Sequence, residues 1–402
     1  MVHIKPFAVE QWMDSHETTA RYNIAETCAA SISLDDLQTF STEDKRNLVN
    51  TSVKLTYGAI RGSEKLRSNI ACLYPNGIGG GGEGSLSPYN VLVTPGAILA
   101  NFLLLYTLVG PGDHVICQYP TYQQLYSVPG SFGAEVSLWK TRLENGWGLD
   151  LDELRGLIRE NTKLIIINNP QNPTGKTIPT ETLIQITNIA REKGIYLFGD
   201  EVYRPLFHSL AKSEHPPSIL SLGYERTIVT GSMSKAYGLA GIRLGWIASN
   251  SQQIIDQCTH ARDYTTISVS QLDDGIASFA LDPACVDNLV SRNNALAKKN
   301  LAILTEFIHE HRNQCDWFHP LAGTTAFVRF SRDGRPVDDV KLCQSLHDGV
   351  GVLFVPGGLC FGQEFAGFVR IGYVCETEVL EKGLEQLRKF MDDGFGSVPL
   401  AE

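Results

Sequence analysis

Several features that define other classes of protein are missing from this chain of 402 residues. Its nine cysteines include no Cys-x-x-Cys pair, which predicts reduced thiols and neither a disulfide framework nor a zinc site. No stretch has the apolar length of a membrane span, and the N-terminus, MVHIKPFAVEQWMDSHE, lacks the apolar core of a signal peptide. A net charge of −10 argues against nucleic acid as a partner. We therefore expect a soluble cytoplasmic protein with no nucleic-acid, membrane or metal partner.

What is present is an α/β pattern. Apolar residues make up 43% of the chain, and its length exceeds what one hydrophobic core usually supports, so two domains are expected. Short Ile-, Val- and Leu-rich runs alternate with helical patterns such as Leu151–Glu160 and Thr180–Lys193, which is typical of a mostly parallel sheet buried on both faces. The expected strands are His114–Gln118, Glu135–Trp139, Leu164–Asn168, Ile195–Gly199, Thr227–Gly231 and Leu244–Ala248.

The pattern changes after about residue 250. A long helical pattern covers roughly 284–311, short strands are expected at Thr325–Phe330 and Phe368–Gly372, and a charged helix at Glu376–Asp392. These elements predict a smaller α+β domain. We expect residues 46–284 to form the large domain, and residues 1–45 and 285–402 to form the small one.

One glycine-rich segment, Gly77–Gly84, formally contains G-x-G-x-x-G. A dinucleotide-binding motif of this type needs a strand before it and a helix after it. Here the expected helix Glu64–Tyr74 precedes the segment and a proline follows it, so we interpret the segment as a loop.

Four segments carry residues with chemical potential. Asn168–Gly175 (NNPQNPTG) and Gly199–Tyr203 (GDEVY) both follow buried strands, at the edge where open α/β sheets bind ligands. Ser232–Arg243 combines serines, glycines, a lysine and an arginine, as an anion site requires, and Arg370 lies in a C-terminal strand. Taken singly, the first segment could be a structural turn and Asp200 a helix cap.

Together, and in this order, these segments resemble the fold-type I enzymes that depend on pyridoxal phosphate (PLP), the aminotransferase class I/II superfamily. The resemblance runs from about Tyr57 to Arg370. It implies a large domain with a mostly parallel mixed sheet between helices, a smaller α+β domain, and PLP as the cofactor.

The resemblance also assigns roles around the cofactor ring. Lys235 would form a Schiff base with PLP, and would carry protons once an amino acid has displaced it as an external aldimine; a lysine amine suits both tasks. Asp200 would pair with the pyridine nitrogen and keep it protonated. Asn172 and Tyr203 would hydrogen-bond the phenolic oxygen of the ring.

The cofactor phosphate would lie at the start of an expected helix, Ala97–Val109. Backbone N–H groups of Gly96 and Ala97 and the helix dipole favour an anion there. Ser232 and Arg243 would complete this phosphate site, because a guanidinium group offers a planar fork to phosphate oxygens.

Three further contacts follow from the resemblance. Tyr122 would stack on the cofactor ring, although a tyrosine at this position can also simply fill the core. Arg370 would bind the α-carboxylate of the substrate in a bidentate pair, with Asn172 nearby; a surface salt-bridge arginine is the alternative. Tyr57 would enter the phosphate site of a neighbouring subunit, which implies a homodimer with shared active sites.

The fold does not determine the reaction, because PLP weakens every bond at the Cα of an amino acid. Transamination is the family's commonest chemistry. The segment Phe7–Leu37, however, resembles the start of capreomycidine synthases, which cyclise a hydroxylated arginine, so a cyclase, lyase or oxidase is the alternative. Glu26 is then a candidate partner for a cationic or hydroxylated side chain; a solvated or capping glutamate is the simpler interpretation. A PLP-binding sensor without turnover is a third possibility.

Overall fold

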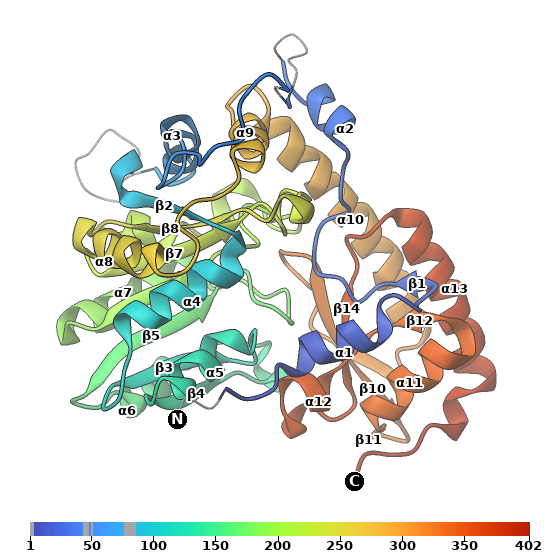
Figure 1. Cartoon of the computed structure of the whole chain (residues 1–402). Coiled ribbons are helices and arrows are strands. Elements are labelled where there is room, and N and C mark those ends of the chain that lie inside the picture. Colours follow the sequence, from blue (N-terminus) through green and yellow to red (C-terminus); the bar gives the residue numbers. More distant parts are fainter. Residues whose placement is uncertain (1–3, 43–47, 50, 76–85) are drawn as a thin grey trace.

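The computed structural model describes residues 4–42, 48–49, 51–75 and 86–402. The glycine-rich segment at 77–84 and the expected domain boundary between residues 45 and 46 lie outside the described residues. In Figure 1 a large sheet with its helices occupies one side of the molecule and a smaller sheet with its helices the other. None of the helices in the described ranges combines the length and the apolar character of a membrane span.

The large domain contains a seven-stranded mixed sheet in the order β2-β8-β7-β6-β5-β3-β4. The strands from β7 to β4 run parallel, whereas β8 is antiparallel to both of its neighbours. Six of the strands were predicted, each to within two residues of its observed ends, and the short β2 was not. The strands are β2 (Val91–Thr94), β3 (His114–Tyr119), β4 (Glu135–Lys140), β5 (Thr162–Asn168), β6 (Tyr196–Asp200), β7 (Thr227–Ser232) and β8 (Gly245–Ser249).

Both faces of this sheet are buried, because neighbouring residues of one strand join different hydrophobic clusters. In β5, Ile165 and Ile167 pack in one cluster, and Leu164 and Ile166 pack in the other. The first cluster includes side chains of α3 (Glu64–Cys72), α6 (Leu151–Leu157), α7 (Thr180–Lys193) and α9 (Gln271–Ala280). The second includes side chains of α4 (Gly96–Leu108), α5 (Gln124–Ser131) and α8 (Gln252–Asp263).

The small domain is built on an antiparallel sheet of order β11-β10-β14-β13, with β9 paired to β10. Its elements share one hydrophobic cluster with residues near the N-terminus, including Trp12 and Ile24. The strands are β9 (Cys315–Trp317), β10 (Thr325–Arg332), β11 (Arg335–Pro336), β13 (Val355–Pro356) and β14 (Phe368–Gly372). The helices are α10 (Val286–Glu310), α11 (Asp339–Val350), α12 (Gly357–Phe361) and α13 (Thr377–Asp393).

The N-terminal region joins both parts of the molecule. Helix α1 (Ala8–His16) packs on the small domain, and strand β1 (Tyr22–Asn23) pairs in parallel with β12 (Val352–Leu353). Helix α2 (Leu34–Thr39) instead contributes Leu37 to a cluster of the large domain. The segment between β1 and α2 therefore crosses from one core to the other, next to the site described below.

Candidate active site

A cavity of about 570 Å³ lies at the carboxyl ends of β5, β6 and β7, where α1 and β14 approach the large sheet. The carboxyl edge of parallel strands is where open α/β sheets bind their ligands. Every site residue predicted from the sequence, apart from Gly96 and Tyr57, lines this cavity. Those that do are Glu26, Ala97, Tyr122, Asn172, Asp200, Tyr203, Ser232, Lys235, Arg243 and Arg370.

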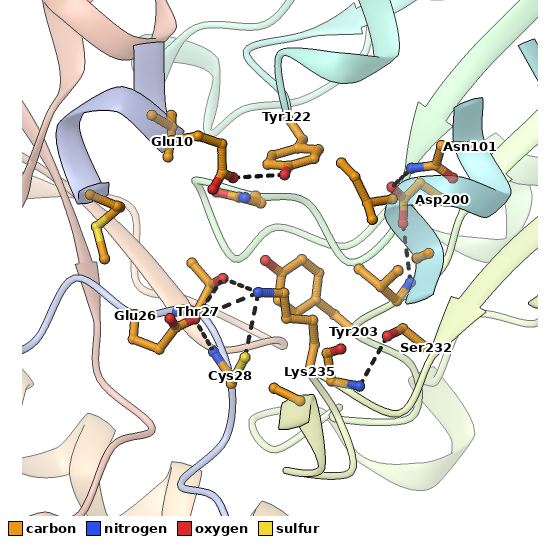
Figure 2. A pocket seen from close by; sticks show the side chains of 18 of the residues that line it. Glu10, Glu26, Thr27, Cys28, Asn101, Tyr122, Asp200, Tyr203, Ser232 and Lys235 are labelled. Carbon is orange, nitrogen blue, oxygen red and sulfur yellow. Dashed lines mark hydrogen bonds and ion pairs between the residues drawn. The ribbon is translucent and has the colours of Figure 1, made fainter. Parts of the chain in front are cut away.

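Asp200 is the last residue of β6 and is almost fully buried. Its carboxylate accepts hydrogen bonds from Asn101 Nδ2 at 3.1 Å and from the Val202 N–H at 3.2 Å (Figure 2). Burial raises the pKa of Asp200 to about 6, although these hydrogen bonds and the charge of Lys235 act in the opposite direction. A buried carboxyl group of this kind is suited to a protonated ring nitrogen.

Asn101 was missed by the sequence reasoning. It lies one turn after Ala97 in α4 and is buried within the apolar run GAILANFLLLYTL. A lone amide inside such a run is the signal that could have revealed it, because a buried polar side chain needs a hydrogen-bond partner.

An anion cradle is formed where α4 begins. Gly96 has a φ of +76°, and a Cβ atom built on it would lie 2.9 Å from Arg243 Nη2, so the guanidinium group is directly beside the start of the helix. Pro95 provides no side-chain cap, and first-turn N–H groups have no partner inside a helix. Ser232, at the end of β7, accepts a hydrogen bond from the Ser234 N–H at 3.0 Å. This arrangement fits a phosphate group.

Lys235 faces the segment formed by residues 24–30. Its Nζ donates to Thr27 Oγ1 at 2.6 Å and lies 3.5 Å from Cys28 Sγ and 3.6 Å from Glu26 Oε1 (Figure 2). Burial alone would lower the pKa of Lys235, but the negative charges that Cys28, Glu26 and Tyr203 carry when ionised raise it above its ordinary value. The sequence had suggested only a substrate contact for Glu26, and the structure places its carboxylate beside Lys235.

Backbone contacts fix this segment in place. The Ala29 N–H donates to the Lys235 carbonyl at 3.0 Å, and the Gly372 N–H donates to the Ile24 carbonyl at 2.8 Å. A Cβ atom at Gly372 would lie 1.7 Å from the Glu26 carbonyl oxygen, so only glycine leaves room for the segment at this point. The segment is thereby held between β14 and the turn that carries Lys235.

Several buried polar atoms of the cavity have no partner within the described ranges. These atoms are Asn172 Oδ1, Asn101 Oδ1 and Arg370 Nε. The guanidinium group of Arg370 donates from Nη2 to the Ala25 carbonyl at 3.1 Å, yet no carboxylate of the described residues lies within ion-pair distance of it. Unpaired buried polar groups are costly, so the cavity is suited to a ligand with several polar groups, including an anion opposite Arg370. The residues present therefore fit PLP together with the carboxylate of an amino acid.

Helix α1 forms the rim of the cavity and was not recognised as a site element from the sequence. Tyr122 donates a hydrogen bond from its hydroxyl to Glu10 Oε1 at 2.8 Å, and its ring lies 4.8 Å from that of Phe7. Glu17 also lines the cavity, so with Glu26 three exposed glutamates surround its opening. Their spacing in the sequence carries no motif that could have revealed this.

Tyr57 lies outside the cavity of its own chain. Its side chain is 73% exposed, and its neighbours in the sequence belong to a set of exposed apolar side chains. The hydrogen bond from Gln271 Nε2 to the Thr56 carbonyl joins the region of Tyr57 to the start of α9. We call this set the apolar patch; its members are Val53, Leu55, Tyr57, Ile60, Tyr264, Ile267 and Leu272.

Comparison with known proteins agrees with this geometry. The chain is 30% identical over 377 residues to the capreomycidine synthase of Streptomyces vinaceus, covering 94% of this chain and 91% of that one. A solved PLP-dependent aminotransferase from Streptococcus suis has 40% identity and a TM-score of 0.87, covering 97% of this chain and 98% of that one. The solved PLP-dependent cyclase OrfR has 26% identity and a TM-score of 0.84 with the same coverage.

The family described as aminotransferase class I and II matches residues 38–387, which is most of the chain. This match covers the strand ends, the anion cradle and Lys235, and the solved relatives above are PLP-dependent proteins. The chain therefore belongs to the aminotransferase class I and II family and is an enzyme whose cofactor is pyridoxal 5′-phosphate.

Proposed function

We propose that the protein is an aminotransferase that acts on an L-amino acid, with Lys235 as the cofactor lysine. The observation that carries this proposal is the convergence of Lys235, Asp200 and Arg370 on one cavity. These side chains supply an amine, a buried carboxyl group and a buried cation without a counter-ion, which are the groups needed to hold PLP and an amino acid together.

The residues that would hold the cofactor follow from the site. Gly96, Ala97, Ser232 and Arg243 would bind its phosphate. Asp200, fixed by Asn101, would pair with the ring nitrogen, while Asn172 and Tyr203 would bind the phenolic oxygen and Tyr122 the ring face. When bound, PLP supplies an electron sink that weakens the bonds at the Cα of the substrate.

The chain's own residues then position the substrate and move its proton. Arg370 binds the α-carboxylate, and its burial on β14 fixes the orientation of the amino acid. Lys235 takes the Cα proton on Nζ, where Thr27 Oγ1 accepts a hydrogen bond and fixes the position of the amine. Transamination would need Lys235 to release this proton again, and water would then free the keto acid while the amino group stays on the cofactor.

A second candidate function is supported by the acidic rim. Glu10, Glu17 and Glu26 surround the opening of the cavity, and the relatives include a capreomycidine synthase and a cyclase. Carboxylates in this position favour a substrate with a cationic side chain. The alternative is therefore a cyclase, lyase or oxidase acting on arginine or another modified polar amino acid.

A half-reaction experiment separates these functions. The purified holoenzyme is mixed with single amino acids, including arginine derivatives, without any keto acid, while absorbance and product masses are recorded. An aminotransferase converts its cofactor once to pyridoxamine phosphate and stops, whereas a cyclase or lyase continues to turn over. No spectral response to any amino acid would contradict both functions and would favour a PLP-binding sensor.

We further propose that two copies of the chain form a homodimer through the apolar patch, with Tyr57 entering the site of the partner. The hydrogen bond between Gln271 and Thr56 brings the segment of Tyr57 to the start of α9, and exposed apolar side chains in both places are typical of a protein interface. Light scattering is expected to give the mass of a dimer, and a Tyr57→Phe variant is expected to bind PLP more weakly without losing the dimer. A monomeric wild-type enzyme would contradict this proposal.

We also propose that the enzyme is cytoplasmic and that its domains divide near residues 45 and 284. The described cysteines are all free thiols, and most are buried, which supports a reducing compartment. Most strand residues of the large sheet lie in two hydrophobic clusters and those of the small sheet in a third, which supports the division, although Tyr119 of β3 belongs to the third cluster. Fractionation of the cells that produce the protein would test the location.

A further inference from the structure

We propose that Glu26 is a positioning residue that keeps the proton on Nζ of Lys235, and that it thereby influences which reaction follows the loss of the Cα proton. The inference rests on the proposed role of Lys235 as the cofactor lysine. It gives Glu26 a role beyond contact with the substrate side chain.

Glu26 is the group that supplies negative charge directly to Lys235. The ionisable groups facing Nζ are Glu26 and Cys28 from the segment 24–30, Asp200 and Tyr203 from the region of β6, and Arg370 from β14. Burial raises the pKa of Cys28 to about 11, so its thiol is uncharged at neutral pH. Tyr203 is neutral as well, because burial raises its pKa.

The remaining charged groups do not substitute for Glu26. Arg370 is positive and opposes a proton on Lys235. Asp200 is the group assigned to the ring nitrogen and is bonded to Asn101 and to the Val202 N–H. Glu26 Oε1, at 3.6 Å, is therefore the anionic atom in contact with Nζ.

The carboxylate of Glu26 is held in place although its side chain is 47% exposed. Its Oε1 accepts hydrogen bonds from the N–H groups of Thr27 at 2.5 Å and Cys28 at 3.1 Å. Burial opposes the ionisation of Glu26, but the charge of Lys235 and these bonds outweigh it and lower the pKa to about 2. Because Gly372 and the Lys235 carbonyl clamp the backbone on either side, the anion is fixed relative to Nζ before a ligand arrives.

This arrangement has a consequence for the reaction. When Nζ has taken the Cα proton, the new ammonium group has an anion in contact with it, so releasing the proton again becomes less favourable. Transamination requires this release, whereas in elimination the electron pair left at Cα expels a leaving group from Cβ, and this step needs no transfer of the proton from Lys235 to carbon. Glu26 therefore disfavours transamination relative to elimination.

The test is a spectroscopic pH titration of the holoenzyme without substrate, which reports when the Schiff-base nitrogen contributed by Lys235 loses its proton. In Glu26→Gln the midpoint of this titration is expected to fall by about one pH unit. This value is the lower end of the range for an opposite charge within about 4–6 Å, and we choose it because the carboxylate is partly exposed. Glu26→Asp, which retains the charge, is expected to recover part of the shift. The alkaline limb of kcat/KM is expected to move with the spectral midpoint.

The matched control is Glu17→Gln, which removes the same charge from the same cavity. No hydrogen bond or ion pair among the described residues joins Glu17 to Lys235, so the midpoint of this variant is expected to stay close to the wild-type value. An unchanged midpoint in Glu26→Gln, or equal shifts in both variants, would overturn the inference. If Lys235→Ala still shows the wild-type titration, the proposed function itself fails, and the two failures are thus distinguishable.

Discussion

The floor and the rim of the cavity are built in opposite ways. The floor consists of buried groups at the ends of strands or in the first half of α4, such as Asp200, Ser232 and Asn101. The rim consists of exposed glutamates on α1, directly after α1 and on the segment after β1, namely Glu10, Glu17 and Glu26. Floor groups are fixed by the large sheet, whereas rim groups depend on how the N-terminal region packs.

This difference indicates a division of tasks. Atoms that must hold a cofactor at a fixed angle lie on rigid elements, where a small displacement is costly. The charges that are proposed to select the substrate lie on exposed segments, where changes of sequence are better tolerated. Changes to the floor should therefore abolish chemistry, and changes to the rim should redirect it.

The most severe test of this division is Lys235→Ala. The variant loses the amine proposed to bind the cofactor and to move the proton, so its rate is expected to fall on the order of 10³–10⁴-fold. Mass spectrometry after borohydride reduction is expected to show no cofactor attached to the chain. Retained activity would contradict the assignment of Lys235.

Asp200→Asn is expected to reduce the rate by about 10²-fold or more, because the ring nitrogen loses its anionic partner. The variant also tests the raised pKa. Burial raises the pKa of Asp200 to about 6, so below that pH the cofactor-free protein holds a proton that PLP binding must displace. Affinity for PLP is therefore expected to weaken about tenfold for each unit that the pH falls below 6.

Fluorescence titration of the cofactor-free protein measures this dependence. The phosphate of PLP titrates in the same pH range, so a control is needed. Asp200→Asn lacks the carboxyl group, and the pH dependence of its affinity for PLP therefore comes from the cofactor alone. If wild type and variant have the same pH dependence, the carboxyl group does not titrate as the structure indicates.

The rim is expected to give a smaller and more selective effect. Glu10→Gln and Glu17→Gln remove exposed carboxylates from the opening, so kcat/KM for arginine relative to leucine is expected to fall by up to about fivefold, the range of one exposed ion pair. The rate with leucine and the absorbance of the bound cofactor should change little. A ratio that stays constant in both variants would remove the support for a cationic substrate.

The last prediction concerns the contact between Gly372 and the segment that carries Glu26. In Gly372→Ala the added methyl group meets the Glu26 carbonyl oxygen, so the segment must shift and unfolding becomes easier by about 1–3 kcal/mol. Gly275→Ala is the control, because its added methyl group would meet no atom within 4 Å in α9. Thermal unfolding of both holoenzymes measures the difference, and equal midpoints would show that the segment adapts freely.

The same contrast explains what the sequence could predict. Strands such as β5 were found because burial on both faces requires near-continuous apolar runs. The floor was found because its residues directly follow those strands in recognisable motifs. Strand β2 was not predicted, because four residues are too few to show a periodic pattern. Helix α8 was not predicted either, because it is mostly polar and has few buried side chains.

The rim could not be predicted from local patterns. Glu26 lies beside Lys235 because the segment 24–30 packs against β14. One of the contacts that hold this segment, the Arg370–Ala25 hydrogen bond, joins residues 345 positions apart. Asn101 and Thr27 likewise gain their roles only through contacts made in the folded chain. The expected homodimer, the division into domains and the individual site roles remain predictions.

The contacts between the segment 24–30 and β14 also determine the order in which parts of the cavity can form while the chain is being synthesised. The large sheet and its anion cradle are complete once residue 249 has emerged, long before β14 is synthesised. Until β14 folds, the first thirty residues have no partner at Gly372, and Arg370 is not yet in place. A nascent chain can thus complete the anion cradle before the segment 24–30 and Arg370 reach the positions that β14 gives them.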